Sequence, residues 1–278
     1  MAGKSSSSVR PKKSLGQHFL HDKNVAEKIV GALQSTSSQE AVLEVGPGMG
    51  VLTRILLETE NNNLKVIEID RDSVAYLKAH YPQLNVMEGD FLEMDLSKIF
   101  PTKFSIIGNF PYNISSQILF KVYENKNQVW QVVGMLQKEV ADRIAAPHGN
   151  KTYGILSVLL QAYYRIDYLF KVPPGVFNPP PKVMSAVVRL ERNDRITLPC
   201  DEVLFKQVVK QGFNNRRKTL RNALKNLILP AFQDQPEGSL ATLLEHEIFN
   251  KRAEQLSVED FIYLTQLIEK SRGGVGSI

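Results

Sequence analysis

The sequence has a single cysteine, Cys200, and no apolar run long enough to cross a membrane. One thiol cannot form an internal disulfide, and it cannot supply a structural zinc site built on cysteines. The nearest apolar stretch, residues 154–162, is interrupted by Ser157 and Gln161, whereas a membrane-spanning helix needs about 18 or more apolar residues. We therefore expect a protein without disulfides or membrane spans, and the cytoplasm is its expected location.

Acidic residues are absent from two segments, residues 1–21 and residues 203–230, although the chain carries 29 of them and its formal net charge is +5. Two acid-free basic segments favour a polyanionic partner such as nucleic acid; a merely solvated helix face is the alternative. The expected RNA-binding residues are Lys12, Lys13, Arg217, Arg221 and Lys225.

The last three of these cations recur every fourth residue, so on one continuous helix they would form a basic row. That row would run beside an apolar stripe that packs on the domain core, formed by Leu220, Leu224 and Leu227. We therefore expect this row to contact RNA phosphates without reading the base sequence.

The serine-rich start of the chain contains no apolar segment, so it does not have the pattern of a secretory signal. We interpret residues 1–12 as a disordered basic arm. An organellar transit peptide is the alternative, because such peptides are also poor in acidic residues.

The first two-thirds of the chain alternate short β-rich runs with helical stretches, the pattern of an open parallel sheet with crossover helices. Residues 165–172 and 184–190 predict an antiparallel hairpin added to the sheet edge. After Leu190 the periodicity becomes helical. We therefore predict an α/β domain over residues 13–193 and a smaller all-helical domain over residues 194–278. The expected strands of the parallel part are residues 41–45, 64–69, 85–88, 104–108 and 131–136, and the expected helices are residues 50–58, 71–79, 137–146 and 154–163.

A glycine-rich turn follows the first expected strand, with Gly46 and Gly48 placed before a helix. Glycines let the chain turn sharply and let a ligand lie against bare backbone. Glu68 ends the next strand about twenty residues later, where a carboxylate can accept both hydroxyls of a ribose. Asp90 follows the third strand and can accept a hydrogen bond from an adenine amine. The alternatives are that Glu68 is an exposed strand end and that Asp90 caps a helix.

The fourth expected strand ends in the sequence Asn109-Phe110-Pro111-Tyr112. The Asn109 side-chain oxygen and the Phe110 carbonyl can accept the two N–H bonds of an exocyclic amine, and Tyr112 can stack on the base. The alternative is a proline-stabilised turn that buries its tyrosine.

These motifs resemble the ribosomal RNA adenine dimethylase family. The resemblance runs from about Lys13 to Leu190, and the motifs that carry it are Leu15-Gly16-Gln17-His18-Phe19-Leu20, the glycine turn, the Asn109 turn, Gln137-Lys138-Glu139-Val140, Phe177-Asn178-Pro179-Pro180-Pro181-Lys182-Val183 and Ser185-Ala186-Val187-Val188-Arg189-Leu190. The three consecutive prolines resemble the branch that acts on the small ribosomal subunit. The fold implied is a Rossmann-like class I S-adenosylmethionine-dependent methyltransferase sheet with a smaller C-terminal helical domain.

The resemblance implies S-adenosylmethionine as cofactor and no metal. Gln17, His18 and Leu20 would line the methionine end of the cofactor, and Asn109 would lie near its sulfonium. Phe177 would grip the target base opposite Tyr112; its alternative is a core residue of the loop. This chain departs from the family at His18, where Asn is usual, and at Phe110, where Leu or Ile is usual.

The implied activity is dimethylation of the N6 amines of two adjacent adenosines in a hairpin loop near the 3′ end of small-subunit (16S) rRNA. The expected partner is an immature small ribosomal subunit, and we expect a monomer with a role in subunit biogenesis. Three alternatives stay open: a ribosome-assembly factor whose binding matters more than its chemistry, a large-subunit methylase of the antibiotic-resistance branch, and a DNA adenine methylase.

Overall fold

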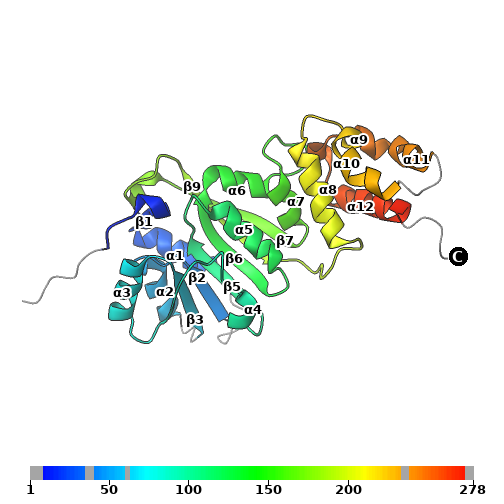
Figure 1. Ribbon diagram of the computed structural model, residues 1–278. Helices are drawn as coiled ribbons and strands as arrows, with labels where there is room; N and C mark the ends of the chain where they lie inside the picture. Colours follow the sequence, from blue (N-terminus) through cyan, green and yellow to red (C-terminus); the bar gives the residue numbers. More distant parts are fainter. Residues whose placement is uncertain (1–8, 35–40, 60–62, 233–237, 273–278) are drawn as a thin grey trace, which may run out of the picture. The chain divides into compact units, whose positions relative to one another are not determined.

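The computed structural model describes residues 9–34, 41–59, 63–232 and 238–272 (Figure 1). It divides into two compact units. The first unit contains the chain up to Ala141 together with Arg165–Arg192, and the second contains Asp142–Tyr164 together with the chain from Asn193 onward. Residues 1–8 of the expected basic arm lie outside the described residues.

The first unit is built on a seven-stranded sheet with the strand order β4-β3-β2-β5-β6-β9-β7. The pairs β3–β4, β2–β3, β2–β5 and β5–β6 are parallel, and β6–β9 is antiparallel. The expected parallel sheet is therefore confirmed, and β7 and β9 are added at its edge. The strands are β2 (Ala41–Val45), β3 (Leu64–Glu68), β4 (Asn85–Glu88), β5 (Phe104–Asn109), β6 (Val129–Gln137), β7 (Tyr164–Val172) and β9 (Ser185–Arg192).

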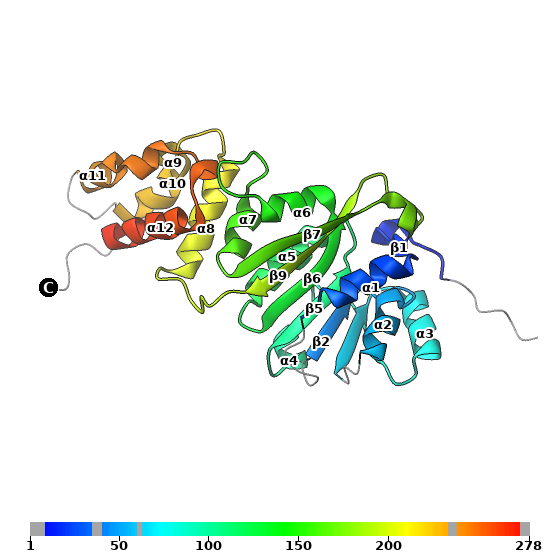
Figure 2. The same cartoon turned by 180° about the vertical axis from the view of Figure 1, so that it is seen from behind.

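Helices cover both faces of this sheet. Helices α1 (Lys23–Gly31) and α2 (Val51–Glu58) lie on one face and α5 (Ser115–Glu124) lies on the other, as Figures 1 and 2 show from opposite sides. Helix α1, which the sequence analysis missed, begins where the Asp22 carboxylate accepts the Val25 N–H at 3.0 Å. Its buried face joins the central core. The remaining helices before β7 are α3 (Arg71–His80), α4 (Leu96–Ile99), α6 (Lys138–Ala145) and α7 (Ile155–Gln161).

A second, two-stranded sheet joins the start of the chain to the proline-rich loop. Strand β1 (Phe19–Leu20) pairs antiparallel with β8 (Phe177–Asn178), and the His21 N–H donates to the Val176 carbonyl at 3.0 Å. Strands of two residues have no periodicity that a sequence pattern could reveal. Two segments more than 150 residues apart in the chain are thereby fixed side by side.

The second unit is helical. Helix α7 packs against α8 (Glu202–Asn214) and α12 (Val258–Arg272), around buried side chains that include Phe205, Phe249 and Phe261. Because of this packing, residues 142–164 join the helical unit, whereas the sequence analysis placed them in the α/β domain. The shorter helices of this unit are α9 (Leu220–Ala223), α10 (Lys225–Ile228) and α11 (Ser239–Glu245), and the short 3₁₀ helices of the chain are η1 (Lys13–Leu15), η2 (Pro174–Val176), η3 (Leu229–Phe232), η4 (Glu247–Asn250) and η5 (Ala253–Gln255).

The expected basic row on one continuous helix is wrong. Helix α8 ends at Asn214, and Thr219 is extended, with φ −65° and ψ 155°, so Arg217 lies in a turn before α9. The Leu220 N–H donates to the Lys251 carbonyl at 2.8 Å, a tertiary hydrogen bond that fixes this break. The guanidinium of Arg221 donates to the Leu244 carbonyl at 2.7 Å. The three cations therefore do not share one helix face.

The bulk of Phe110 is accommodated by a pair of glycines. Gly108 on β5 is paired in register with Gly134 on β6, and the Phe110 ring, 1% exposed, lies over both. A Cβ at Gly134 would lie 2.6 Å from a ring carbon of Phe110. A Cβ at Gly108 would also lie 2.5 Å from the Val45 carbonyl oxygen. The absence of side chains at Gly108 and Gly134 thus leaves room for a phenylalanine ring where Leu or Ile is usual.

We predict that Gly134→Ala destabilises the protein by about 1–3 kcal/mol, because the added methyl group overpacks the site against Phe110. In the double variant with Phe110→Leu, the loss of stability should be smaller than the sum of the two single losses. Gly108→Ala is the comparison: Phe110→Leu should relieve its 2.8 Å contact with the ring but not its 2.5 Å clash with the Val45 carbonyl, so more of its loss of stability should remain in the double variant. The midpoint of thermal unfolding checks this, and strictly additive losses for Gly134→Ala with Phe110→Leu would contradict it.

Candidate active site

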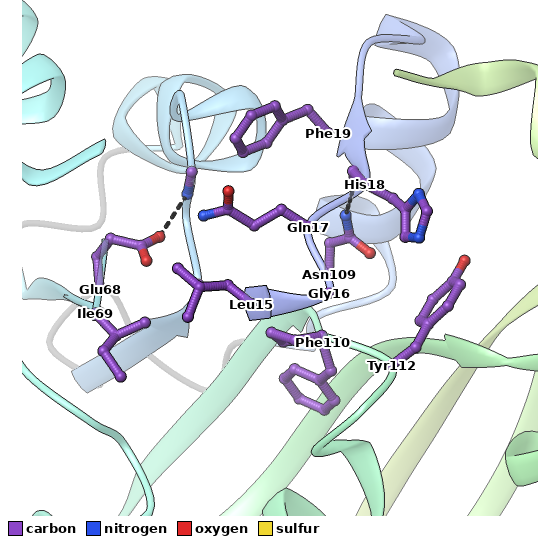
Figure 3. A pocket seen from close by; sticks show the side chains of 13 residues that line it. Leu15, Gly16, Gln17, His18, Phe19, Glu68, Ile69, Asn109, Phe110 and Tyr112 are labelled. Carbon is purple, nitrogen blue, oxygen red and sulfur yellow. Dashed lines mark hydrogen bonds between the residues drawn. The ribbon is translucent and has the colours of Figure 1, made fainter. Parts of the chain in front are cut away.

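A hollow lies at the carboxyl ends of β2, β3 and β5. Strand β2 sits between β3 and β5, so the strand order reverses there, and open α/β sheets bind ligands at that point. This hollow, called the large hollow below, encloses about 460 Å³ of space that is partly open to solvent. Figure 3 shows the side chains around it. The lining residues are Leu15, Gly16, Gln17, His18, Phe19, Gly46, Gly48, Glu68, Ile69, Asn109, Phe110, Pro111 and Tyr112.

The glycine turn brings bare backbone to this hollow. Gly46 and Gly48 have φ values of 69° and 56°, a region that side chains other than glycine rarely adopt. A Cβ at Gly48 would lie 2.8 Å from the Phe19 ring. Glycine is therefore required at position 48 both for the conformation and for the approach of Phe19.

Glu68 is buried at the end of β3 and is held by two backbone donors. Its Oε2 accepts the Gly48 N–H at 3.0 Å, and its Oε1 accepts the Asp70 N–H at 2.9 Å. Burial raises the pKa of this carboxyl, against the effect of these hydrogen bonds. The alternative of an exposed strand end is wrong, because Glu68 is only 5% exposed. Each carboxylate oxygen can accept more than one hydrogen bond, so Glu68 keeps acceptor capacity toward the hollow.

The orientation of the Asn109 amide follows from its hydrogen bond. The Asn109 Nδ2 donates to the His18 carbonyl at 2.9 Å. A carbonyl can only accept, so the amide nitrogen must face it, and the amide oxygen points away from it, as Figure 3 shows. The end of β5 therefore presents a hydrogen-bond acceptor to the large hollow.

Tyr112 stands at the edge of the hollow and is held from two sides. Its hydroxyl is hydrogen bonded to the buried Ser185 hydroxyl, and its ring centroid lies 5.3 Å from that of His18 at an interplanar angle of 30°. Burial raises the pKa of Tyr112 despite the hydrogen bond to Ser185. Tyr112 is therefore an un-ionised, fixed aromatic surface.

His18 contributes through its backbone and through its ring. Its carbonyl orients Asn109, while its Nδ1 lies 2.8 Å from the Pro179 carbonyl. Because that carbonyl can only accept, Nδ1 carries the proton. The ring thus connects the segment before β1 with the proline-rich loop after β8. The departure from Asn at position 18 leaves the backbone contact with Asn109 in place.

Three residues expected at the site are not among the residues that line the large hollow. Phe177 is 3% exposed and belongs to the central core, so it does not face Tyr112 across the hollow. Leu20 also packs in this core, although it lines a smaller neighbouring hollow. The Asp90 carboxylate accepts the Leu92 N–H at 2.8 Å within a turn; no helix begins there, because α4 begins at Leu96. Leu20 and Phe177 pair with each other across β1 and β8, and both side chains lie in the central core. Strands of two residues are too short to be predicted from the sequence pattern.

Glu44 is a buried acid that the sequence analysis did not single out. It lines the small hollow, about 340 Å³ in empty volume, together with Gly46 and Asn109. Glu44 is 1% exposed, and its Oε2 accepts the Thr53 hydroxyl at 2.6 Å. Burial, together with the nearby charge of Glu68, raises the pKa of Glu44 to about 8. The available signal was an acidic residue inside an otherwise apolar strand.

Metal-ligand clusters and membrane-spanning helices are both missing from the described residues. Within residues 9–34, 41–59, 63–232 and 238–272, no three His, Cys, Asp or Glu side chains are grouped so that they could hold a metal ion. In the same part of the chain, no helix is both long and apolar enough to span a membrane.

Comparisons with known proteins agree on one family. A family model described as ribosomal RNA adenine dimethylase matches residues 9–269. A protein of Cytophaga hutchinsonii named ribosomal RNA small subunit methyltransferase A is 56% identical over 262 residues, which cover 94% of this chain and 98% of the relative. A protein of the same name from Parabacteroides distasonis is 55% identical over 264 residues, covering 94% of this chain and 95% of the relative.

Solved structures show the same fold. A dimethyladenosine transferase from Plasmodium falciparum matches with a TM-score of 0.78 and 28% identity, over 91% of this chain and 98% of that chain. The 23S rRNA methyltransferase ErmE matches with a TM-score of 0.63 and 23% identity, over 89% of this chain and 99% of that chain. The second match supports the fold alone.

Glu44 predicts a pH dependence of stability. Its folded pKa of about 8 lies above the ordinary value of 4.5, so the unfolded carboxyl ionises first as the pH rises. Relative to an ionised carboxyl, the protonated Glu44 contributes its full stabilisation below pH 4.5. This contribution falls as the pH rises from 4.5, and it is lost once the pH has risen through 8. The free energy of unfolding of Glu44→Gln, relative to that of wild type, should therefore increase by up to about 3 kcal/mol between about pH 5 and pH 8. Urea unfolding at both pH values measures it, and a constant difference would contradict the assignment.

Proposed function

Because this chain belongs to the ribosomal RNA adenine dimethylase family, we propose that it methylates the N6 amines of two adjacent adenosines in a hairpin loop near the 3′ end of small-subunit rRNA. The observation that carries the chemistry is the amide oxygen of Asn109, directed into the large hollow by the His18 carbonyl. The names of the bacterial relatives favour the small subunit over the large one.

S-adenosylmethionine is the methyl donor, and the residues of the large hollow fit it. The buried Glu68 carboxylate suits the two hydroxyls of a ribose, and the backbone at Gly46 and Gly48 admits a ligand at close range. Gln17 and His18 line the same hollow on the side of the Asn109 turn. When bound, the cofactor supplies an electrophilic methyl group on its sulfonium.

The residues after β5 act on the target amine. The lone pair of that amine is delocalised into the adenine ring, which makes it a poor nucleophile. Hydrogen bonds from the amine to the Asn109 Oδ1 and the Phe110 carbonyl favour tetrahedral character at nitrogen, and this interaction strengthens toward the transition state. Alignment with the methyl group lowers the barrier further, so no strong base is needed before attack.

The target base must leave its stack to reach this turn. Tyr112, fixed by Ser185 and packed beside His18, offers the aromatic face on which the base stacks. A second transfer requires that the monomethylated amine rotate and present its remaining hydrogen to one of the two acceptors. The site therefore has to hold an amine that is larger after the first transfer than before it.

The cations of the helical unit bind the rRNA backbone. Arg217 and Lys225 are exposed, and they belong to a segment without acidic residues. Arg221 is exposed as well, although its guanidinium also donates to the Leu244 carbonyl. Lys13 is exposed near the start of the chain and can add a phosphate contact. The substrate is an immature small ribosomal subunit in the cytoplasm. The protein binds it as a monomer, and this binding also contributes to assembly of the subunit.

The primary test uses labelled S-adenosylmethionine with purified, unmethylated small and large ribosomal subunits, followed by nucleoside analysis by mass spectrometry. We expect dimethyladenosine in small-subunit rRNA alone. Label in the large subunit would move the protein to the antibiotic-resistance branch. Cofactor binding without label in either subunit would favour a role in assembly over catalysis.

Asn109→Ala should lower methyl transfer by about 10²–10³-fold, because the variant loses an acceptor that acts in the transition state. The binding constant of S-adenosylhomocysteine, measured by calorimetry, separates this effect from a loss of cofactor binding. Substantial residual transfer by a folded Asn109→Ala protein would refute the hydrogen-bonding role.

Lys225→Glu should weaken binding to small-subunit particles and reduce the slope of log affinity against log salt by about 1 for each phosphate that the side chain no longer neutralises. Lys78→Glu, on an exposed position of α3, makes the same change in net charge and serves as the control. Equal effects of the two substitutions would show that only net charge matters, against a phosphate contact at Lys225.

A further inference from the structure

One wall of the large hollow is a short segment near the start of the chain. Leu15 to Phe19 supply five consecutive lining residues. The first of them, Leu15, ends the single turn of η1, and Gly16 then takes a φ of 62°. A Cβ at Gly16 would lie 2.6 Å from the Asn113 side chain, so the segment lies against the turn that follows β5. We call residues 12–19 the roof segment.

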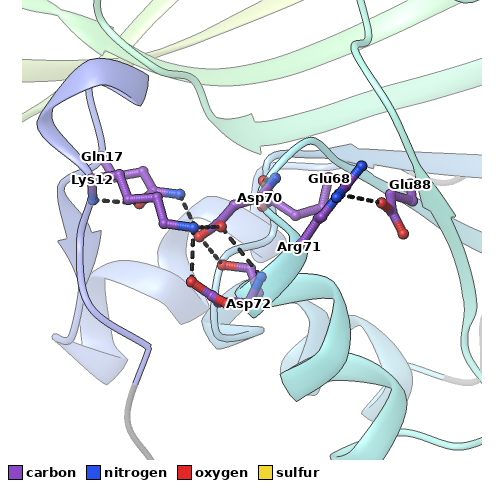
Figure 4. Close-up of polar contacts among 8 residues, drawn as sticks. Lys12, Gln17, Glu68, Asp70, Arg71, Asp72 and Glu88 are labelled. Carbon is purple, nitrogen blue, oxygen red and sulfur yellow. Dashed lines mark hydrogen bonds and ion pairs between the residues drawn. The ribbon is translucent and has the colours of Figure 1, made fainter.

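The roof segment is tied to α3 through Asp70, whose side chain is 0% exposed. This carboxylate accepts hydrogen bonds from the Lys12 ammonium, from the Gln17 Nε2 at 3.2 Å and from the Ser73 hydroxyl at 3.1 Å. The Lys12 Nζ also lies 2.8 Å from the Asp72 carboxylate. Figure 4 shows both lysine contacts together with Gln17.

The Gln17 amide closes the arrangement. Its Nε2 donates to Asp70, while its Oε1 accepts the backbone N–H of Lys12 at 2.8 Å. The hydrogen bonds to Asp70 and Asp72 raise the pKa of Lys12. Burial opposes ionisation of Asp70, but its hydrogen bonds from Lys12, Gln17 and Ser73 hold its pKa below the ordinary value. The pair is therefore charged on both sides at neutral pH.

Asp70 also reaches the cofactor residue Glu68. Its backbone N–H donates to the Glu68 Oε1 at 2.9 Å, while its side chain holds Lys12 and Gln17. One residue thus connects the roof segment with the carboxylate assigned to the ribose. Movement of the roof segment away from α3 would leave a buried carboxylate without its cation, which is unfavourable.

We propose that Lys12, Gln17 and Asp70 form a clasp that keeps the roof segment closed over the cofactor and thereby slows cofactor release. The clasp rests on the proposed function, because it assumes that S-adenosylmethionine occupies the large hollow. Asp70 is a positioning residue that acts through Glu68 and the roof segment. Lys12, which the sequence analysis assigned to RNA, then contributes to cofactor retention instead.

The experiment measures the dissociation rate of S-adenosylhomocysteine from the full chain by displacement with excess S-adenosylmethionine. Lys12→Met should release it about three- to fivefold faster, the range expected for one partly exposed ion pair. Lys12→Arg keeps the charge and should stay within about twofold of wild type. Lys13→Met removes the same charge one residue away and should leave the rate unchanged.

The salt dependence of cofactor release and a second substitution distinguish the clasp from a purely structural role of Lys12. Release from wild type should accelerate with ionic strength, and this dependence should be weaker for Lys12→Met. Asp70→Asn keeps a side chain that can cap α3 but removes the charge. The double variant Lys12→Met with Asp70→Asn should release cofactor no faster than the faster single variant, because both remove the same interaction.

Two failures are distinguishable. If wild type binds S-adenosylhomocysteine, and Lys12→Met and Lys13→Met release it at the same rate as wild type, the clasp is refuted while the cofactor site stands. If wild type does not bind S-adenosylhomocysteine at all, the proposed cofactor site itself is refuted. Equal weakening of small-subunit binding by both lysine variants, with unchanged cofactor release, would return Lys12 to the RNA contact and overturn the clasp.

Discussion

The hydrogen bonds on the Glu68 carboxylate are the interaction on which the site depends. They join the loop after β2 to the loop after β3, because Gly48 donates to one oxygen and Asp70 to the other. A buried carboxyl without such donors would be costly, so the two loops are held in one arrangement. The glycine turn, the start of α3 and, through Asp70, the roof segment all take their places relative to this single side chain.

Much of the sheet and of the site could be predicted, because local patterns determine them. Buried strands read as apolar runs, and parallel strands bring their carboxyl ends to one edge, so Gly46, Glu68 and Asn109 were expected together. The pairing of β1 with β8 could not be predicted, since it joins two-residue segments far apart in the chain. The core position of Phe177, which was the alternative considered for it, accompanies this pairing. The supposed basic row failed because tertiary hydrogen bonds, such as that from Leu220 to Lys251, ended the helix that local periodicity would have continued.

The two departures from the family pattern have different physical bases. At Phe110 a larger ring is accepted because paired glycines on β5 and β6 leave room for it. The carbonyl that the proposed mechanism uses belongs to the backbone and is present with either side chain. At His18 the ring contacts the Pro179 carbonyl of the proline-rich loop, while the backbone carbonyl orients Asn109. In both cases the proposed chemistry uses main-chain atoms, and the side chain adapts to its surroundings.

This division has a consequence for how the site can vary over evolutionary time. The acceptor that orients Asn109 is a carbonyl group, which every amino acid possesses. Replacement of the side chain at position 18 therefore does not by itself remove the contact that directs the amide. Substitutions at this position can therefore change the contact with the proline-rich loop while the backbone contact with Asn109 stays in place. If the proposed reaction uses this geometry, its dependence on the main chain leaves the neighbouring side chains available for change.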